Sequence, residues 1–177
     1  MKLLGLLRHA KSDWDDMGLG DFDRGLNARG RKGAALMGRH IVEHGVAWQR
    51  IVASPAERTR RTLEASGLDR NVVWDERLYL ATTDALFEVL QAAEGDPRSV
   101  LAVGHNPGLQ ELIFELVPPE AEDALLGVAA EKFPTAAFAV LECRIDRWRD
   151  LAPGCARLVH LARPRDLDPE LGPERER

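Results

Sequence analysis

The chain has 177 residues, of which 45% are hydrophobic and 30% charged, and its formal net charge is −5. This length predicts a single domain with a substantial core, and the composition is typical of water-soluble globular proteins. Because the chain has neither a basic stripe with interleaved aromatic residues nor an apolar run of membrane-spanning length, we expect no nucleic-acid partner and no membrane partner.

The first apolar run ends in two chemically versatile side chains. Residues 3–7 are apolar, Arg8 and His9 follow, and the sequence then becomes polar. This pattern predicts a buried parallel strand, and open α/β sheets bind ligands beyond the carboxyl ends of such strands. A guanidinium suits phosphate oxygens and an imidazole can be a nucleophile, base or acid, although such a pair can also be merely solvated.

The apolar run of residues 3–7 is too short for a secretion signal, which favours a cytoplasmic protein.

A long loop and a helix follow the first strand. Residues 13–26 are rich in Asp and Gly, which predicts a loop of a length that is often functional in compact domains. Asn27 is expected to cap a helix over residues 28–44, and Gly45 is expected to end it.

The end of that helix fits the H-x-x-E-H zinc pattern through His40, Glu43 and His44. Such a site needs a third ligand from a downstream helix, and the sequence offers no obvious one. Two histidines at a helix C-terminus also stabilise the helix through its dipole. We therefore expect no metal site here.

The second strand, residues 50–53, leads directly into a helix start. Ser54, Pro55 and Glu57 fit the N-cap, N1 and N3 positions, which predicts a helix that runs to about residue 65. A helix N-terminus offers unpaired N–H groups and the positive end of a dipole, both of which suit an anion. Arg58 would lie in the first turn and could reach the same anion.

A third junction of this kind follows the buried strand predicted over residues 99–104. That strand delivers His105, with Asn106 as the expected N-cap and Pro107 as the first residue of a helix. His105 would therefore also lie where a strand ends and a helix begins.

The remaining elements complete a three-layer α/β/α fold with a mostly parallel sheet and an antiparallel edge. They are a strand over 72–74, a helix over 85–93 capped by Asp84, a helix over 120–126, and antiparallel strands over 135–143 and 156–162. We expect one domain over residues 1–164 and an extended or disordered tail over 165–177. The two cysteines, Cys143 and Cys155, are expected to be free thiols.

The three junctions together supply two guanidiniums, two imidazoles and two helix N-termini, with no carboxylate among them. Such a site should bind a phosphoryl group and stabilise its charge during transfer. Because fixed cations supply the charge that a metal ion supplies elsewhere, we expect neither a metal nor a cofactor. The chain also lacks a P-loop pattern that would hold a nucleotide.

These motifs resemble the histidine phosphatase (phosphoglycerate mutase-like) superfamily. The matching segments are residues 7–12, residues 54–59 with Thr62, and residues 104–107. The chain length, the pair Leu78-Tyr79 and the pair Pro134-Thr135 look most like the small phosphohistidine phosphatase branch, the SixA type. The resemblance extends to about residue 164 and implies a phosphoglycerate mutase-like fold.

The resemblance also implies roles for individual residues. His9 would be the nucleophile, His105 a second catalytic residue, and Arg8, Arg58 and His105 the ligands of the phosphoryl oxygens. Many family members carry a general acid, and which residue of this chain corresponds to it stays open. One placement puts Glu76 at that position, and another puts Leu80 there and so leaves the position without an acid. An Asp of the first loop could also serve as the acid.

We therefore expect a metal-independent phosphatase that forms a phosphohistidine on His9 and dephosphorylates protein phosphohistidine. An imidazole leaving group needs less help from an acid than an alkoxide does, and we favour the placement that leaves Leu80 at the acid position. The alternatives are a small-molecule phosphomonoesterase or mutase of the same superfamily and a non-catalytic module that binds phosphorylated partners.

Overall fold

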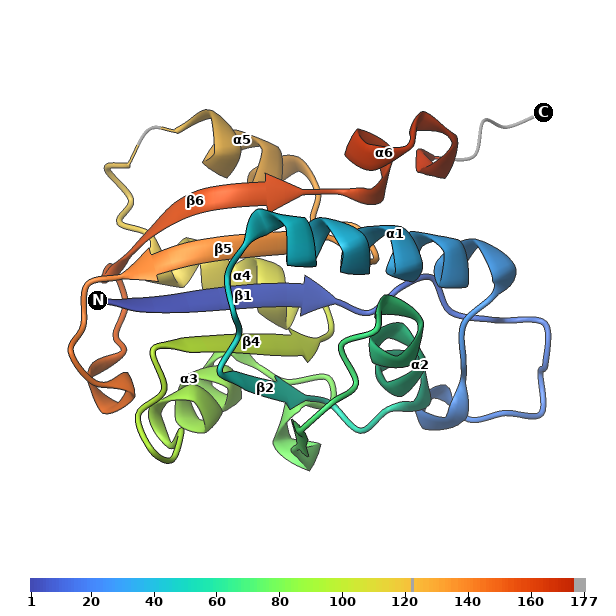
Figure 1. Cartoon of the computed structure of the whole chain (residues 1–177), viewed down its shortest axis with the longest axis horizontal. Coiled ribbons are helices and arrows are strands. Elements are labelled where there is room, and N and C mark those ends of the chain that lie inside the picture. Colours follow the sequence, from blue (N-terminus) through green and yellow to red (C-terminus); the bar gives the residue numbers. More distant parts are fainter. Residues whose placement is uncertain (122, 174–177) are drawn as a thin grey trace.

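The computed structural model describes residues 1–121 and 123–173, and a six-stranded sheet in the order β3-β2-β4-β1-β5-β6 forms its centre. The strands are β1 (Lys2–Arg8), β2 (Arg50–Ala53), β3 (Val72–Trp74), β4 (Ser99–Gly104), β5 (Phe138–Cys143) and β6 (Ala156–Ala162). The first four run parallel, whereas β5 is antiparallel to both β1 and β6. The expected mostly parallel sheet with an antiparallel edge is thus confirmed (Figure 1).

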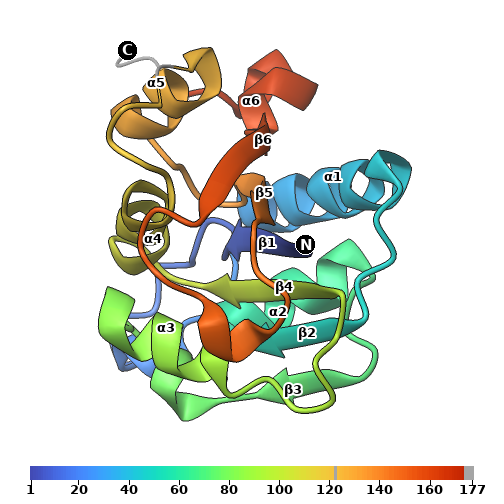
Figure 2. The same cartoon turned by 90° about the vertical axis from the view of Figure 1, so that its left-hand side faces the viewer.

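Helices cover both faces of this sheet (Figure 2). They are α1 (Ala28–His44), α2 (Glu57–Ser66), α3 (Thr83–Gln91), α4 (Gly108–Leu116), α5 (Ala124–Glu131) and the short α6 (Pro164–Leu167). One face carries α1 and α2, and the other carries α3, α4 and α5, which confirms the three-layer arrangement. No helix in the described part of the chain is long and apolar enough to cross a membrane.

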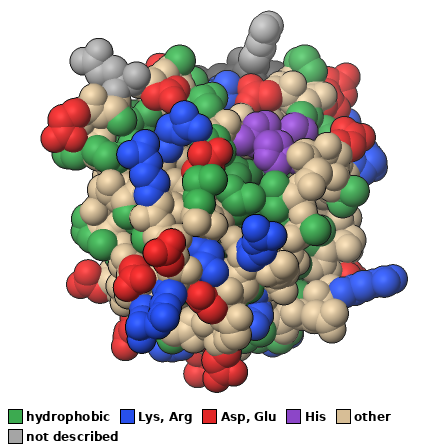
Figure 3. Space-filling model, turned by 60° about the vertical axis from the view of Figure 1, so that its left-hand side comes forward, with side chains coloured by type: hydrophobic (Ala, Val, Ile, Leu, Met, Phe, Trp, Pro, Cys, Tyr) green, Lys and Arg blue, Asp and Glu red, His purple; other side chains and the backbone are tan. Residues whose placement is uncertain are grey.

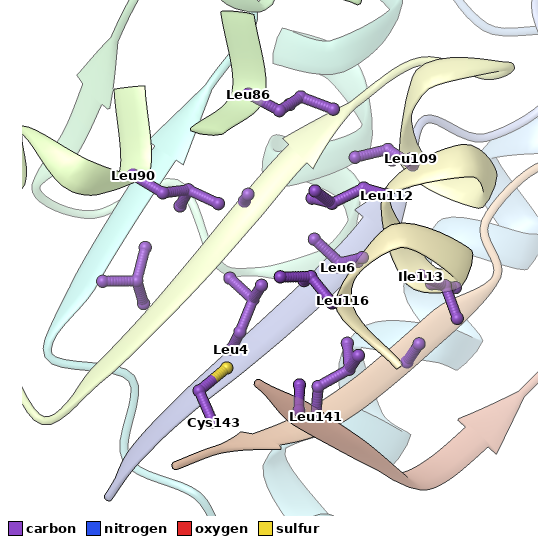
Figure 4. Close-up of a cluster of buried hydrophobic side chains, with 14 of the residues drawn as sticks. Leu4, Leu6, Leu86, Leu90, Leu109, Leu112, Ile113, Leu116, Leu141 and Cys143 are labelled. Carbon is purple, nitrogen blue, oxygen red and sulfur yellow. The ribbon is translucent and has the colours of Figure 1, made fainter. Parts of the chain in front are cut away.

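Two apolar clusters, one on each side of the sheet, make up most of the core, and β1 contributes to both. Leu4 and Leu6 pack with side chains of α3 and α4 on one side (Figure 4). Leu7 faces the opposite side, where it packs against Met37 of α1 and Leu63 of α2. A strand buried on both faces needs a continuous apolar run, which explains the composition of residues 3–7.

The starts of α2 and α3 differ from the sequence prediction. The α2 helix begins at Glu57, and its N-cap is Ala56 rather than Ser54. The α3 helix is capped by Thr82, whose hydroxyl accepts a hydrogen bond from Ala85 N at 3.3 Å, rather than by Asp84. Several residues near each start could serve as caps, and backbone geometry decides among them.

The α4 helix also begins later than expected, at Gly108, after a cis peptide bond between Asn106 and Pro107. Asn106 still accepts a hydrogen bond from Gln110 N at 3.2 Å, but it lies one residue before the N-cap. Further along, the helix expected over 120–126 also begins later than predicted: α5 runs over Ala124–Glu131, and Asp123 caps it.

The segment after β6 is more ordered than its composition suggests. An extended or disordered tail was expected over 165–177, whereas residues 164–167 form α6 and residues 169–171 form a 3₁₀ turn. Lys32 of α1 pairs with Asp168 at 3.2 Å, and the Arg29 guanidinium donates to the Gly172 carbonyl, so α1 holds this segment in place. Residues 174–177 lie outside the described residues.

Candidate active site

The four residues singled out in the sequence lie together at the carboxyl ends of β1, β2 and β4, the right-hand end of the sheet in Figure 1. Arg8 ends β1 and His9 follows it, Arg58 lies in the first turn of α2, and His105 follows β4. All four line one cavity of about 500 Å³. His9, Arg58 and His105 are only 7%, 5% and 4% exposed, so the protein holds them in fixed positions.

The His9 ring is oriented by its own backbone neighbour. Its Nδ1 lies 2.7 Å from the Ala10 carbonyl oxygen. A carbonyl can only accept a hydrogen bond, so Nδ1 carries the ring hydrogen and Nε2 keeps its lone pair. Burial, assisted by the charges of Arg8 and Arg58, lowers the pKa of His9 to about 4, although the bond to Ala10 opposes this shift. At neutral pH, His9 is therefore an uncharged imidazole with a nucleophilic nitrogen.

His105 faces His9 across the cavity, with 5.2 Å between the ring centroids. Its Nε2 lies 2.7 Å from the Ser54 hydroxyl, which itself accepts a hydrogen bond from Ala56 N at 3.3 Å. Ser54 can thus donate its hydrogen to Nε2, which leaves the ring hydrogen on Nδ1. That Nδ1 is buried and has no hydrogen-bond partner among the described residues. Burial, and then the nearby His9 and Arg58, lower the pKa of His105 to about 3.

The two guanidiniums are close enough to influence each other. Arg8 donates to the Phe133 carbonyl at 3.1 Å, while its buried Nε has no partner among the described residues. Burial and then the charge of Arg58 lower the pKa of Arg8. Two buried cations that repel each other are stabilised when an anion lies between them.

A side-chain hydroxyl couples the segment that carries His9 to the helix that carries Arg58. Thr62 Oγ1 accepts a hydrogen bond from Ala10 N at 2.8 Å and donates to the Arg58 carbonyl at 2.7 Å. Thr62 is fully buried, so neither bond competes with water. The residue next to His9 and the backbone of Arg58 are therefore fixed relative to each other.

The structure adds one carboxylate that the three junctions did not include. The first loop forms a short turn, η1 (Asp21–Asp23), over the cavity, and Asp21 Oδ2 lies 3.0 Å from Arg58 Nη2. The Tyr79 hydroxyl donates to the same carboxylate, and this bond, followed by Arg58, lowers the pKa of Asp21. Asp21 is therefore ionised at neutral pH. The acid-rich composition of residues 13–26 was the available signal, but loop composition cannot say which Asp reaches the site.

Glu76 and Leu80, the two residues that can be placed at the family's general-acid position, lie in different surroundings. Leu80 lines the cavity, whereas Glu76 begins the short 3₁₀ helix η2 (Glu76–Leu78), is exposed and is not among the lining residues. Among the described residues that line the cavity, Asp21 carries the one carboxylate, and it is engaged by Arg58 and Tyr79.

The H-x-x-E-H motif lies at the opposite end of α1 from the cavity. His160 does lie beside the motif, with its Nε2 2.8 Å from His40 Nε2 and its ring stacked on His44, but it comes from the strand β6 and not from the downstream helix that the zinc pattern requires. Figure 3 shows histidine side chains gathered in one surface patch beside hydrophobic ones. Across residues 1–121 and 123–173, no group of three or more His, Cys, Asp or Glu side chains is arranged to hold a metal ion.

Comparisons with known proteins agree with this geometry. Residues 4–81 match the family described as the histidine phosphatase superfamily (branch 1). An uncharacterised protein of Mycobacterium tuberculosis is 36% identical over 160 residues, which cover 90% of this chain and all of that protein.

Two solved structures show the same fold over almost the whole chain. A candidate phosphohistidine phosphatase SixA from Nakamurella multipartitia has a TM-score of 0.81 and 31% identity, covering 92% of this chain and 96% of its own. A candidate phosphohistidine phosphatase SixA from Agrobacterium tumefaciens has a TM-score of 0.73 and 29% identity, covering 91% of this chain and 97% of its own.

Proposed function

Since this chain belongs to the histidine phosphatase superfamily, in its SixA-type branch, and is therefore a phosphatase, we propose that it hydrolyses protein phosphohistidine through a phosphohistidine formed on His9. The observation that carries the proposal is the hydrogen bond from His9 Nδ1 to the Ala10 carbonyl. It leaves Nε2 as a free nucleophile in a cavity shared with Arg8, Arg58 and His105.

In the first step, His9 Nε2 attacks the phosphorus atom of the substrate. An N–P bond forms to Nε2 while the bond from phosphorus to the substrate's ring nitrogen breaks, and the leaving electron pair stays on that nitrogen. Arg8 and Arg58 offer forked N–H donors to the phosphoryl oxygens, and His105 Nδ1 offers its unpartnered hydrogen. These groups stabilise the charge that the oxygens carry in the transition state.

In the second step, water attacks the phosphorus atom of the phosphorylated His9. The N–P bond breaks, inorganic phosphate leaves with the oxygen of the water, and His9 returns to its neutral form. Because the protein holds the guanidiniums in place before the substrate arrives, little reorganisation is needed in either step.

The leaving group favoured by this site is an imidazole. A phosphohistidine whose second ring nitrogen is protonated releases a neutral imidazole, which needs no acid from the enzyme. An alcohol, in contrast, leaves as an alkoxide unless an acid protonates it. Glu76 lies away from the cavity and the pKa of Asp21 is lowered, so neither carboxyl group is a ready proton donor at neutral pH.

The rim of the cavity supports a protein substrate. Trp14 and Leu80 line the cavity and are 60% and 55% exposed, and Met17, Leu19 and Phe22 of the loop that carries Trp14 are also exposed. Such a group of apolar side chains beside a charged cavity is typical of a surface that contacts another protein.

The two cysteines are free, which supports a reducing compartment such as the cytoplasm.

One observation favours a second candidate, a small-molecule phosphomonoesterase. Asp21 lies in the cavity, and a protonated Asp21 could donate to an alcohol leaving group. Rates on a phosphohistidine peptide and on p-nitrophenyl phosphate, compared with those on a sugar phosphate, separate the two candidates. We expect efficient turnover of the phosphohistidine peptide and of p-nitrophenyl phosphate, because their leaving groups need no acid. We expect little turnover of the sugar phosphate.

The His9→Ala variant tests the nucleophile. We expect kcat to fall by at least roughly a thousandfold on every substrate, because His105, the other imidazole of the cavity, has its Nε2 engaged by Ser54. The matched control is His44→Ala, which replaces an exposed histidine at the far end of α1 and should leave kcat unchanged. Near-normal turnover by His9→Ala would contradict the proposal, and a wild-type phosphoenzyme that never releases phosphate would point to a binding module instead.

A further inference from the structure

The two cysteines lie against each other at the end of the sheet opposite the cavity, and we propose that they are an oxidative modification site, at which hydrogen peroxide produces a disulfide. Cys143 ends β5 with its sulfur among the core side chains (Figure 4), and Cys155 directly precedes β6. Cys143 pairs with Lys2 at the start of β1, whereas His9 follows the end of that strand. The site is therefore separate from the cavity, and the inference goes beyond the proposed function.

The strand register brings the two cysteines within reach of a disulfide. Cys143 lies opposite Ala156, and the amide of Arg144 donates to the Cys155 carbonyl at 2.8 Å. Opposite Cα atoms of antiparallel strands are about 4.5–5.5 Å apart and a strand rises about 3.4 Å per residue, which places the two cysteine Cα atoms about 6 Å apart. Disulfides join Cα atoms that are about 4.4–6.8 Å apart.

The side chains of the two cysteines also meet. Both belong to or pack against the same apolar cluster, and their thiols share a hydrogen bond. The loop between the two strands holds this arrangement in place, because Trp148 Nε1 donates to the Pro97 carbonyl at 2.6 Å and Gly154 N donates to the Glu115 carbonyl at 2.9 Å. A disulfide can therefore form here without rearrangement of the loop.

The two thiols differ in reactivity. Cys143 is completely buried, whereas Cys155 is partly exposed. The hydrogen bond from the Cys143 thiol lowers the pKa of Cys155, although burial opposes this shift, and the same bond, followed by burial, raises the pKa of Cys143. A thiolate is the form that reacts with peroxide, so Cys155 is the residue that attacks and Cys143 the residue that resolves.

The oxidation takes two steps and consumes one molecule of peroxide. In the first, the Cys155 sulfur attacks a peroxide oxygen, so that an S–O bond forms, the O–O bond breaks, and hydroxide leaves and becomes water with the thiol proton. In the second, the Cys143 sulfur attacks the Cys155 sulfur. An S–S bond then forms, the S–O bond breaks, and hydroxide leaves as water with the Cys143 proton. Both thiols are oxidised, and the peroxide is reduced to water.

The product would clamp β6, a border strand of the sheet, to β5. The same bond closes residues 144–154 into a loop in the unfolded chain, which lowers the conformational entropy of that state. We expect the urea midpoint of unfolding to be roughly 1 M higher for the oxidised protein than for the reduced one. The kcat on p-nitrophenyl phosphate should stay unchanged, because the cavity lies at the other end of β1.

Peptide mapping of the full chain tests whether the bond forms. Trypsin cuts after Lys132, Arg144, Arg149 and Arg157, so each cysteine lies on its own peptide, residues 133–144 and residues 150–157. After treatment of the folded protein with hydrogen peroxide and alkylation of the remaining thiols, we expect these two peptides to be joined, with a mass that is two hydrogens below their sum. Dithiothreitol should separate them again and restore the lower urea midpoint.

Two variants assign the roles of the cysteines. In Cys143→Ala the sulfenic acid on Cys155 has no resolving partner, so dimedone should label Cys155 and peroxide should not raise the urea midpoint. In Cys155→Ala the same dose of peroxide should leave the buried Cys143 unmodified. Circular dichroism verifies that each variant is folded, and the mapping of the wild-type protein does not depend on either variant.

Three results would overturn the inference. They are separate alkylation of both cysteines in the peroxide-treated wild type, a disulfide that joins Cys155 residues of two chains, and a linked protein whose urea midpoint equals that of the reduced form. None of these measurements uses a phosphohistidine substrate. Failure here would therefore leave the proposed function intact, and failure of phosphohistidine hydrolysis would leave the disulfide to stand on its own test.

Discussion

At the scale of single residues, hydrogen bonds rather than residue types decide what each side chain can do. His9 and His105 are both buried imidazoles with lowered pKa values. They differ because a carbonyl oxygen fixes the hydrogen on Nδ1 of His9, whereas a hydroxyl bonds to Nε2 of His105. One ring consequently presents a lone pair to the cavity and the other can present an N–H group. Sequence motifs identified both histidines but could not distinguish these two states.

Asp21 is the residue whose substitution is most informative about anion binding. Its carboxylate pairs with Arg58 and adds negative charge to the cavity that must receive a phosphoryl group. In Asp21→Asn this charge is lost, so the inhibition constant for inorganic phosphate should decrease by about threefold to tenfold.

The control for this measurement is Asp23→Asn, which removes an exposed carboxylate from the same short turn and should change the constant little. Weaker binding of phosphate by Asp21→Asn would be incompatible with this account. It would mean that the main effect of Asp21 is to hold Arg58 in place.

At the scale of elements, the sequence predicted the strands better than the helix starts. All six strands were expected within a few residues, because runs of buried β-branched and aliphatic side chains bounded by polar residues are strong local signals. The N-caps of α2, α3 and α4 were wrong: Ala56 and Pro107 cap α2 and α4 without a side-chain hydrogen bond, and Thr82 rather than Asp84 caps α3. The approach of Asp21 to Arg58 could not be predicted, because it depends on how a long loop folds back over the cavity.

The hydroxyl of Thr62 offers a test of how α2 is held against β1. In Thr62→Val, the amide of Ala10 loses its acceptor inside the protein. An unpaired buried donor costs about 1–3 kcal/mol, so we expect the free energy of unfolding to decrease by that amount and kcat/KM to decrease by roughly tenfold. Urea denaturation and steady-state kinetics measure the two effects.

Thr59 of the same helix provides a matched control. It is equally buried, but its hydroxyl has no hydrogen-bond partner among the described residues. Thr59→Val should therefore leave the free energy of unfolding unchanged or raise it slightly. If both variants lost the same stability and activity, the two bonds of Thr62 would have no specific role.

At the scale of the whole molecule, the five histidines fall into two groups, one in the cavity and one at the far end of α1. Burial is the largest cause of the lowered pKa values of His9, His40, His105 and His160. The folded protein therefore keeps these rings neutral at pH values where the unfolded chain binds protons. The contribution of these neutral rings to the free energy of unfolding is present above the pKa of a histidine in the unfolded chain, about 6.5. It is lost as the pH falls towards the pKa values of the same rings in the folded protein.

We accordingly expect the urea midpoint of unfolding to decrease steadily between about pH 7 and pH 4.5. The variant His40→Gln removes one of these groups outside the cavity, so its midpoint should depend less steeply on pH than that of the wild type. A midpoint that stays constant over this interval would show that the buried histidines are not coupled to folding.

His9 follows an inner strand of the sheet, β1, which pairs with β4 along one edge and with β5 along the other. Local fraying of a sheet starts at its borders, and β3 and β6 occupy those borders here. Amide protons of β1 should consequently be among the last to exchange with deuterium. Enzyme inactivation by denaturant should coincide with global unfolding, because the catalytic centre cannot come apart while the rest of the domain stays intact.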